Sequence, residues 1–342
     1  MSKRTIYRHP SAVVHRSAVI LFILAALIVA ALIWTGCGQK MELPTETTTG
    51  QWGSGDTTYV RINPPWNARH PYGQDFQSPR DIVIGWDGNI YVSDSLRVWQ
   101  LDRAGQVQRR YLIPDLEDIR AIAQGPDNKI YAVKGDSNVY NLDGTFLKPD
   151  LLSVRRARYT GVAVDIDNWI YLADSGRQML LKYLFTDSTT LADTLATYGS
   201  GGGTVDLPRG IDIDLSLNVS FAQEGGSFHV QRLRPSGDGY RPDVYFGLEG
   251  DSLKEFLRPQ DVAVDAEGYI YVADTGNHRI QKFSSGGGLK IAFGDSGSAG
   301  GQFLFPAGIA VDEDLMLYIA DSGNHRVERY QLSTEIDIPE EP

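Results

Sequence analysis

Residues 271–283 read YVADTGNHRIQKF, and residues 318–330 read YIADSGNHRVERY. The two stretches are near-copies that place His278 and His325 at the same point. Each is preceded by a short apolar run and an acidic turn, RPQDVAVDAEGYI before the first copy and FPAGIAVDEDLML before the second. Short apolar runs separated by turn-forming residues are typical of β-strands, so the repeated unit predicts β-structure.

The same unit recurs four more times, and its first and second apolar runs always stand nine residues apart. The six pairs of equivalent positions are Asp81 and Ile90, Ala121 and Ile130, Gly161 and Ile170, Gly210 and Val219, Asp261 and Ile270, and Gly308 and Leu317. A repeat period of roughly 40 to 51 residues is typical of a four-stranded propeller blade. The sequence therefore predicts an all-β fold, a six-bladed β-propeller with four antiparallel strands per blade.

The last repeat stops after its third strand. An aromatic residue followed by Gly ends the fourth strand elsewhere, as at Phe293-Gly294, and the same pair occurs at Tyr72-Gly73 before the first repeat. We therefore expect the segment between Thr57 and Tyr72 to supply the outer strand of the sixth blade, which closes the ring and removes a free sheet edge. Residues 57–332 are predicted to form one propeller domain. A solenoid is the competing architecture, but it needs no such closure.

The N-terminus has the features of an export segment. Four Lys and Arg residues precede an apolar run of 17 residues from Ala18 to Trp34, and small residues then lead to Cys37, the only cysteine. This boundary resembles the lipobox of bacterial lipoproteins, which implies a signal peptide over residues 1–36 and a lipid on Cys37. The alternative is an uncleaved membrane anchor, because the run is just long enough to span a bilayer. Both interpretations place the rest of the chain outside the cytoplasm.

Residues 37–56 are expected to form a flexible tether, and residues 333–342 a short acidic tail. These segments imply a propeller that is lipid-anchored in the cell envelope, on the outer membrane in a Gram-negative organism because Gly38 follows the cysteine. Removing residues 1–36 takes away four basic and no acidic residues, which lowers the net charge from −11 to −15. So acidic a domain repels phosphate backbones, and no nucleic-acid partner is expected.

The motifs Pro-x-Gly-Ile-Ala-Val-Asp, Ile-Tyr-Val-Ala-Asp and Asp-x-Gly-Asn-His-Arg-Ile resemble those of NHL repeats. The resemblance covers nearly all of residues 78–332 and is strongest in the fifth and sixth repeats. It implies a six-bladed propeller, in agreement with the count of repeats. It fixes no function, because the family includes RNA-binding domains, an amidating lyase with a histidine-bound zinc in its channel and many scaffolds. No histidine stands in the segments expected to line the channel here, which counts against the lyase.

We name the four strands of a blade a to d from the channel outward. His278 and His325 lie in turns between strands b and c, where they are interpreted first as packing residues and otherwise as binding residues. The position just before strand a should ring the channel mouth, and three arginines there predict a positive well for a carboxylate or sulfate. The competing interpretation pairs each arginine with a nearby acid such as Asp81 or Asp118. In blade order the six mouth residues are Arg80, Arg120, Thr160, Arg209, Gln260 and Ala307.

No nucleophile, phosphate-binding or metal-binding motif occurs. Asp residues recur at strand ends, but one per blade spread round a ring favours turn formation over a calcium site; they are Asp94, Asp174, Asp274 and Asp321. We therefore predict a monomeric, non-catalytic binding or scaffold propeller without a cofactor. It would recognise an envelope protein or an anionic ligand through Arg80, Arg120, Arg209, Gln260, His278 and His325. The alternative is a lyase or lactone hydrolase with a divalent metal in the channel.

Overall fold

The structure is a computed structural model. It describes residues 58–66, 76–95, 97–112, 119–142, 146–147, 156–185, 189–237 and 239–333. The expected signal segment, Cys37, the tether, Tyr72-Gly73 and the acidic tail beyond Ser333 lie outside the described residues. Within them, no helix has the length and apolar character needed to cross a membrane.

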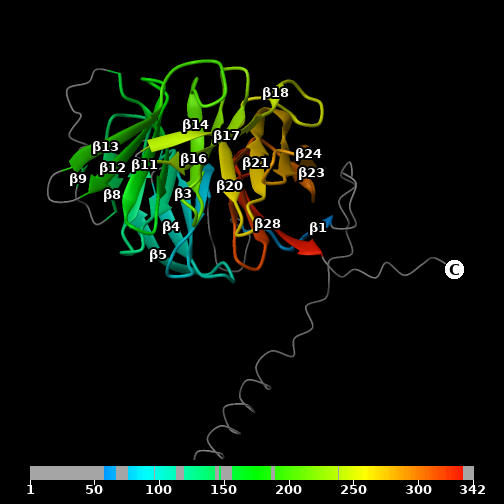
Figure 1. The fold of residues 1–342 in the computed structure, drawn as a ribbon. Coiled ribbons are helices and arrows are strands. Elements are labelled where there is room, and N and C mark those ends of the chain that lie inside the picture. Colours follow the sequence, from blue (N-terminus) through cyan, green and yellow to red (C-terminus); the bar gives the residue numbers. More distant parts are fainter. Residues whose placement is uncertain are drawn as a thin grey trace, which may run out of the picture. The chain divides into compact units, whose positions relative to one another are not determined.

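Six four-stranded antiparallel sheets follow one another along the described chain, as the repeats predict (Figure 1). Blade 1 holds β2 (Pro79–Ile84), β3 (Ile90–Asp94), β4 (Arg97–Leu101) and β5 (Val107–Leu112). Blade 2 holds β6 (Ala121–Gln124), β7 (Ile130–Val133), β8 (Val139–Asn141) and β9 (Phe146–Leu147). Blade 3 holds β10 (Tyr159–Val164), β11 (Trp169–Asp174), β12 (Met179–Phe185) and β13 (Thr189–Ala196).

The other three blades repeat this pattern, with short 3-10 turns between strands b and c in the last two. Blade 4 holds β14 (Pro208–Ile213), β15 (Val219–Gln223), β16 (Val230–Ser236) and β17 (Gly239–Phe246). Blade 5 holds β20 (Asp261–Val264), β21 (Ile270–Asp274), η1 (Thr275–Asn277), β22 (Arg279–Phe283) and β23 (Leu289–Phe293). Blade 6 holds β26 (Pro306–Val311), β27 (Met316–Asp321), η2 (Ser322–Asn324), β28 (Arg326–Ser333) and β1 (Thr58–Arg61).

The nine-residue spacing reflects a fixed hairpin. In blade 5, Val264 of strand a pairs with Ile270 of strand b across a tight turn, and Ile84 pairs with Ile90 in the same way in blade 1. The second position of the spacing is buried in every blade, because strand b is covered on both faces by neighbouring blades. Its six side chains are at most 4% exposed: Ile90, Ile130, Ile170, Val219, Ile270 and Leu317.

The hydrophobic core is divided among the blade interfaces. The buried side chains of the described residues fall into six clusters, and each cluster joins one blade to the next. Small side chains such as Ala173, Ala273 and Ala320 are fully buried in strand b and allow adjacent sheets to approach closely. Each blade therefore shares its buried side chains with both of its neighbours.

The N-terminal strand closes the ring, as predicted. Strand β1 pairs antiparallel with β28, which places the first described strand beside the last one (Figure 1). Arg61 of β1 forms an ion pair with the fully buried Glu328, with both N···O distances at 2.7 Å. Trp66 follows and pairs through its backbone with Val327. Its indole lies in the cluster between blades 6 and 1, against Gly105, where any side chain would clash with the ring.

Two small pairings were not anticipated from the sequence. The loops into blades 5 and 6 each contain a short parallel pair, β18 (Leu248–Glu249) with β19 (Glu255–Phe256) and β24 (Asp295–Ser296) with β25 (Gln302–Phe303). In each loop a glycine with positive φ follows strand d and packs against the ring of a buried phenylalanine. These pairs are Gly247 with Phe256 and Gly294 with Phe303. The loops that lead into blades 5 and 6 are thus each held by a buried phenylalanine of the loop itself.

Candidate functional site: the arginine mouth

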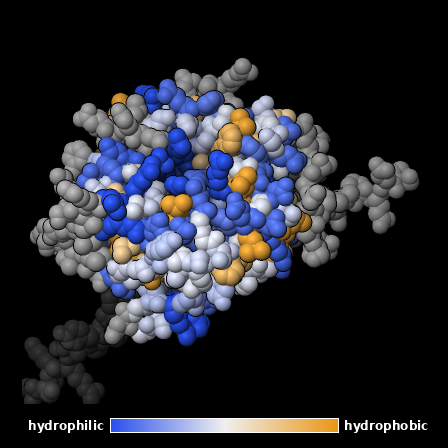
Figure 2. All heavy atoms as spheres, turned by 90° about the horizontal axis from the view of Figure 1, so that it is seen from above, coloured by the Kyte–Doolittle hydropathy of each residue, from blue (hydrophilic) through white to orange (hydrophobic). Residues whose placement is uncertain are grey.

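The residues just before or at the start of strand a meet around one end of the channel. A cavity of about 160 Å³ opens there, and we refer to it as the arginine mouth. Figure 2 shows the propeller from above, where hydrophilic side chains border a hollow near the middle of the face. The mouth is lined by all six predicted residues, Arg80, Arg120, Thr160, Arg209, Gln260 and Ala307, together with Asp81, Ala121, Gly210, Asp261, Thr275, Phe305 and Ser322.

Glu224 organises one side of the mouth. Its two carboxylate oxygens accept hydrogen bonds from Nη2 of Arg209 at 2.7 Å and from Nε2 of Gln260 at 2.6 Å. Arg209 is therefore paired with an acid, although not with one that the sequence singled out. Its Nε is buried and has no hydrogen-bond partner among the described residues. Because buried donors in native proteins are almost always paired, this N–H is a donor that a bound group can satisfy.

The hydroxyl groups at the mouth serve as joints between blades. Thr160 Oγ1 donates to the carbonyl of Pro208 at 2.7 Å, and Thr275 Oγ1 donates to that of Pro306 at 2.6 Å. Ser322 makes the equivalent bond to blade 1. Each bond links one blade to strand a of the next. Since these hydroxyl protons are already used, the donors suited to an anion at this end are the guanidinium N–H groups.

A narrow neck separates the mouth from the deeper channel. Below it lies a second cavity of about 240 Å³, lined by the strand a residues of all six blades. The neck is made of the four residues that line both cavities, Asp81, Ala121, Gly210 and Asp261. These residues occupy the first position of the nine-residue spacing, where the other blades have Gly161 and Gly308. Four of these six positions hold Ala or Gly, which leaves room for the carboxyl groups of Asp81 and Asp261.

The two neck carboxyl groups share a hydrogen bond. Burial raises the pKa of Asp81 to about 7. Burial and the nearby charge of Asp81 raise the pKa of Asp261 well above its usual range. Each carboxyl also accepts a backbone N–H from the next blade, Asp81 from Ile122 at 2.7 Å and Asp261 from Ile309 at 2.9 Å. Near neutral pH the pair therefore retains a proton, which reduces the negative charge beside the arginines.

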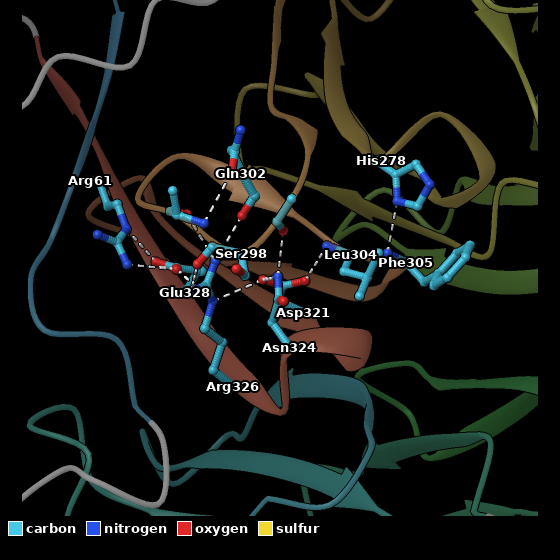
Figure 3. Close-up of polar contacts among 12 residues, drawn as sticks. Arg61, His278, Ser298, Gln302, Leu304, Phe305, Asp321, Asn324, Arg326 and Glu328 are labelled. Carbon is cyan, nitrogen blue, oxygen red and sulfur yellow. Dashed lines mark hydrogen bonds and ion pairs between the residues drawn. The ribbon is translucent and has the colours of Figure 1, made fainter.

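The two near-identical turns between strands b and c hold the loop that leads into their own blade. In blade 6, Arg326 Nε donates to Asp321 at 2.9 Å, and its Nη groups donate to the carbonyls of Ser298 and Gln302, each at 2.8 Å (Figure 3). Asn324 donates to Asp321 at 2.7 Å as well. Arg279, Asn277 and Asp274 repeat these contacts in blade 5. The Asn and Arg side chains thus bind the loop that leads into their own blade.

The histidines of the same turns contact the blade that follows. His278 Nδ1 accepts the backbone N–H of Phe305 at 3.1 Å. His325 Nδ1 contacts the carbonyl of Gln77, and because a carbonyl only accepts, this nitrogen carries the proton. The two equivalent histidines are therefore assigned opposite tautomers by their partners. Both contacts match the packing interpretation, and neither histidine is among the described residues that line the mouth.

The comparison with known protein families agrees with this architecture. The family model for the NHL repeat matches residues 256–283 and 303–330, which contain the two turns just described. The chain contains NHL repeats within a six-bladed β-propeller, and we refer to it as the NHL propeller. In this NHL propeller the Asn, His and Arg side chains of the repeat join loops and blades, so their recurrence is explained by architecture.

A relative and two solved structures place the NHL propeller among known proteins. The E3 ubiquitin-protein ligase TRIM71 of Bos taurus is 36% identical over 190 residues, which are 51% of this chain and 21% of that protein. The match thus spans about a fifth of the relative's length. An auxiliary nutrient binding protein of Bacteroides thetaiotaomicron has a TM-score of 0.57 and 14% identity over 75% of this chain and 69% of that one.

A gluconolactonase of Xanthomonas campestris has a TM-score of 0.56 and 15% identity, and the likeness covers 84% of this chain and 100% of that one. At such identities both structural likenesses show the fold alone. In the described part of the NHL propeller, no group of three or more His, Cys, Asp or Glu side chains is arranged to hold a metal ion.

The strand-end aspartates tie loops to strands. Each is fully buried, and its Oδ1 accepts a backbone N–H from the loop leading into strand a of its own blade. The donors are Gln77 and Ser78 for Asp94, Arg158 for Asp174, Leu257 for Asp274 and Leu304 for Asp321. Asp174 also has the predicted turn role, because it accepts the backbone N–H groups of Gly176 and Arg177 in its own turn, while Asp274 and Asp321 accept the Asn side chains of theirs. The loop contacts pair residues about 17 positions apart, which a local sequence pattern does not reveal.

Besides the four neck residues, sequence reasoning missed Thr275, Phe305 and Ser322 in the lining of the mouth. Thr275 and Ser322 start the two turns, and Phe305 immediately precedes a proline at the start of strand a. Repeat alignment offered one signal, because Thr275 and Ser322 occupy the same position and both carry a hydroxyl. Their approach to the mouth depends on the neighbouring blade, which supplies the carbonyl that each hydroxyl contacts.

Proposed function

We propose that this NHL propeller is a non-catalytic binding module that takes an anionic group, presented by a protein or a small ligand, at the arginine mouth. We further propose that Cys37 carries a lipid that anchors it in the cell envelope. The observation that supports the binding role is the convergence of Arg80, Arg120 and Arg209 on one cavity in a strongly acidic chain. The similarity to a nutrient binding protein of a Bacteroides species and to TRIM71 accords with a binding role.

Removal of mouth arginines is expected to weaken anion binding. Charge-assisted hydrogen bonds contribute about 1.5–3 kcal/mol, so Arg80→Ala or Arg209→Ala should raise the Kd for acetate roughly 10- to 100-fold. Acetate titrations of the mature domain, followed by NMR or calorimetry, measure this. Arg209→Lys keeps a positive charge next to Glu224. It therefore shows how much of the loss in Arg209→Ala comes from leaving Glu224 without that charge.

The matched control is Arg103→Ala, because Arg103 pairs with the exposed Glu313 and Asp314 and does not line the mouth. This variant should bind acetate like the original protein. If Arg80→Ala and Arg209→Ala both retain the original affinity, the mouth is not the binding site. Equal losses in Arg103→Ala would point to a general charge effect.

Anion affinity at the mouth should fall as pH rises through about 7. Below that pH the Asp81–Asp261 pair is protonated and nearly neutral, and above it the pair gains a negative charge beside the arginines. An added negative charge near the bound anion weakens binding by about 1–2 kcal/mol at the effective dielectric of a protein surface, or about 5- to 30-fold in Kd. Acetate titrations at pH 5.5 and 8.5 measure the change. Asp81→Asn should flatten the profile, and a flat profile in the original protein would contradict the prediction.

A further inference from the structure

Phe305 gives the arginine mouth an apolar side. Its side chain is 50% exposed and lines the cavity next to Ala307 at the start of blade 6. In ring order the next two blades supply Arg80 and Arg120 to the same cavity. A single exposed aromatic residue is common on protein surfaces, so exposure alone carries no argument. The juxtaposition with a cationic side of the same small cavity is the relevant feature.

Comparison with the other blades separates Phe305 from the general pattern. The residue before the proline of strand a has positive φ in three blades, 54° at Leu207, 49° at Arg258 and 54° at Phe305. The unusual backbone is therefore a property of the repeat. Of these three residues, Phe305 alone lines the mouth. The repeat thus provides a scaffold position, and blade 6 places an aromatic ring there.

His278 holds Phe305 in place. Its Nδ1 accepts the backbone N–H of Phe305 at 3.1 Å, and the two rings pack with their centroids 4.6 Å apart (Figure 3). A left-handed conformation costs free energy for a side chain as large as phenylalanine, so the residue needs such support. The ring is therefore fixed before any ligand arrives, which lowers the entropy lost on binding. His278 acts here as a positioning residue.

We propose that the mouth takes a carboxylic acid with an apolar, preferentially aromatic, substituent: the carboxylate contacts the arginines and the substituent packs on Phe305. This rests on the proposed anion-binding function and specifies its ligand class. A cavity of about 160 Å³ is smaller than the ~300–1,000 Å³ of pockets for drug-sized molecules. It suits a small monocarboxylic acid or the carboxylate end of a larger ligand.

The test compares acetate with phenylacetate on the mature domain by NMR titration or calorimetry. Phenylacetate should bind on the order of tenfold tighter, since its ring removes apolar surface from water. Phe305→Ala should abolish that preference, so that the two acids bind with similar affinity, while Phe305→Leu should keep part of it. Leu207→Ala is the matched control, because it alters the equivalent position in blade 4, outside the mouth, and should keep the full preference.

The positioning role of His278 is tested by the preference for phenylacetate over acetate in two further variants. His278→Ala should reduce the phenylacetate preference without changing acetate binding. His278→Asn should restore part of it, because asparagine tolerates the φ of 57° and offers an acceptor to the Phe305 N–H. If neither acid binds, the proposed function itself fails. If acetate binds through the arginines and phenylacetate binds no better, or if Phe305→Ala lowers both affinities equally, the proposed ligand class is wrong and the anion site stands.

Discussion

Replacement of Arg61 by alanine is expected to destabilise the propeller by up to about 3 kcal/mol, because it removes one of the two arginines that pair with a buried carboxylate. Arg61 is 8% exposed and Glu328 is 0% exposed. Two hydrogen bonds of 2.7 Å join them across the β1–β28 pairing that closes the ring (Figure 3). Glu328 would retain Arg326 at 2.8 Å, so the loss should not exceed the lower end of the ~3–5 kcal/mol that a fully uncompensated buried charge costs. Urea denaturation of the mature domain measures the change in the free energy of unfolding.

Two further variants identify the cause of this loss. Arg61→Leu combined with Glu328→Leu should recover much of the stability, because a buried ion pair replaced by apolar side chains is often neutral or better. Arg103→Ala breaks an exposed pair with Glu313 and should cost at most about 1 kcal/mol. An Arg61→Ala variant as stable as Arg103→Ala would show that the closing strand contributes little to the folded state.

Replacement of Trp66 by alanine is expected to cost about 3–5 kcal/mol, since truncation of a buried tryptophan leaves a cavity. Trp66 is 0% exposed and packs against Tyr318 with ring centroids 5.7 Å apart. Its backbone N–H and carbonyl each pair with Val327 at 2.9 Å, and both bonds survive the substitution. The loss therefore reports on the side chain between blades 6 and 1. Urea denaturation is again the measurement.

Trp86 offers a matched control. It is 48% exposed in the turn between strands a and b of blade 1, so Trp86→Ala should change stability by no more than about 1 kcal/mol. Comparable losses for the two tryptophans would contradict the assignment of Trp66 to the closing interface. A loss confined to Trp66 would support ring closure by residues before the first repeat.

Ring closure illustrates how far sequence reasoning reached. The missing fourth strand of the last repeat and the unassigned segment before the first repeat predicted that β1 would join blade 6, and the pairing of Tyr59 with Leu332 confirms it. This was predictable because every blade repeats the same four strands, so a strand missing at one end of the chain must be supplied from the other end. The buried partners of Arg61 were not predictable, since Glu328 lies 267 residues away.

At the arginine mouth, too, the sequence predicted some features and not others. The repeat alignment identified the six positions at the channel end, because equivalent positions of a closed ring must lie at equal depth. It did not identify Glu224, Phe305 or the shared hydrogen bond of the neck. Asp81 and Asp261 belong to blades 1 and 5, and the equivalent position of blade 6, which stands between them in the ring, is Gly308. Such contacts depend on ring curvature, which no single repeat encodes.

The sequence by itself determined the β-structure, the number of blades, the hairpin spacing and the positions that face the channel, because these follow from local turn chemistry and from repetition. Only the tertiary structure decided that the two conspicuous histidines reach the next blade, in opposite tautomers, and that Phe305 stands beside the arginines. The physical reason is that every interface joins two repeats. A side chain's partner is therefore supplied by the neighbouring blade, and its role is set by packing between blades.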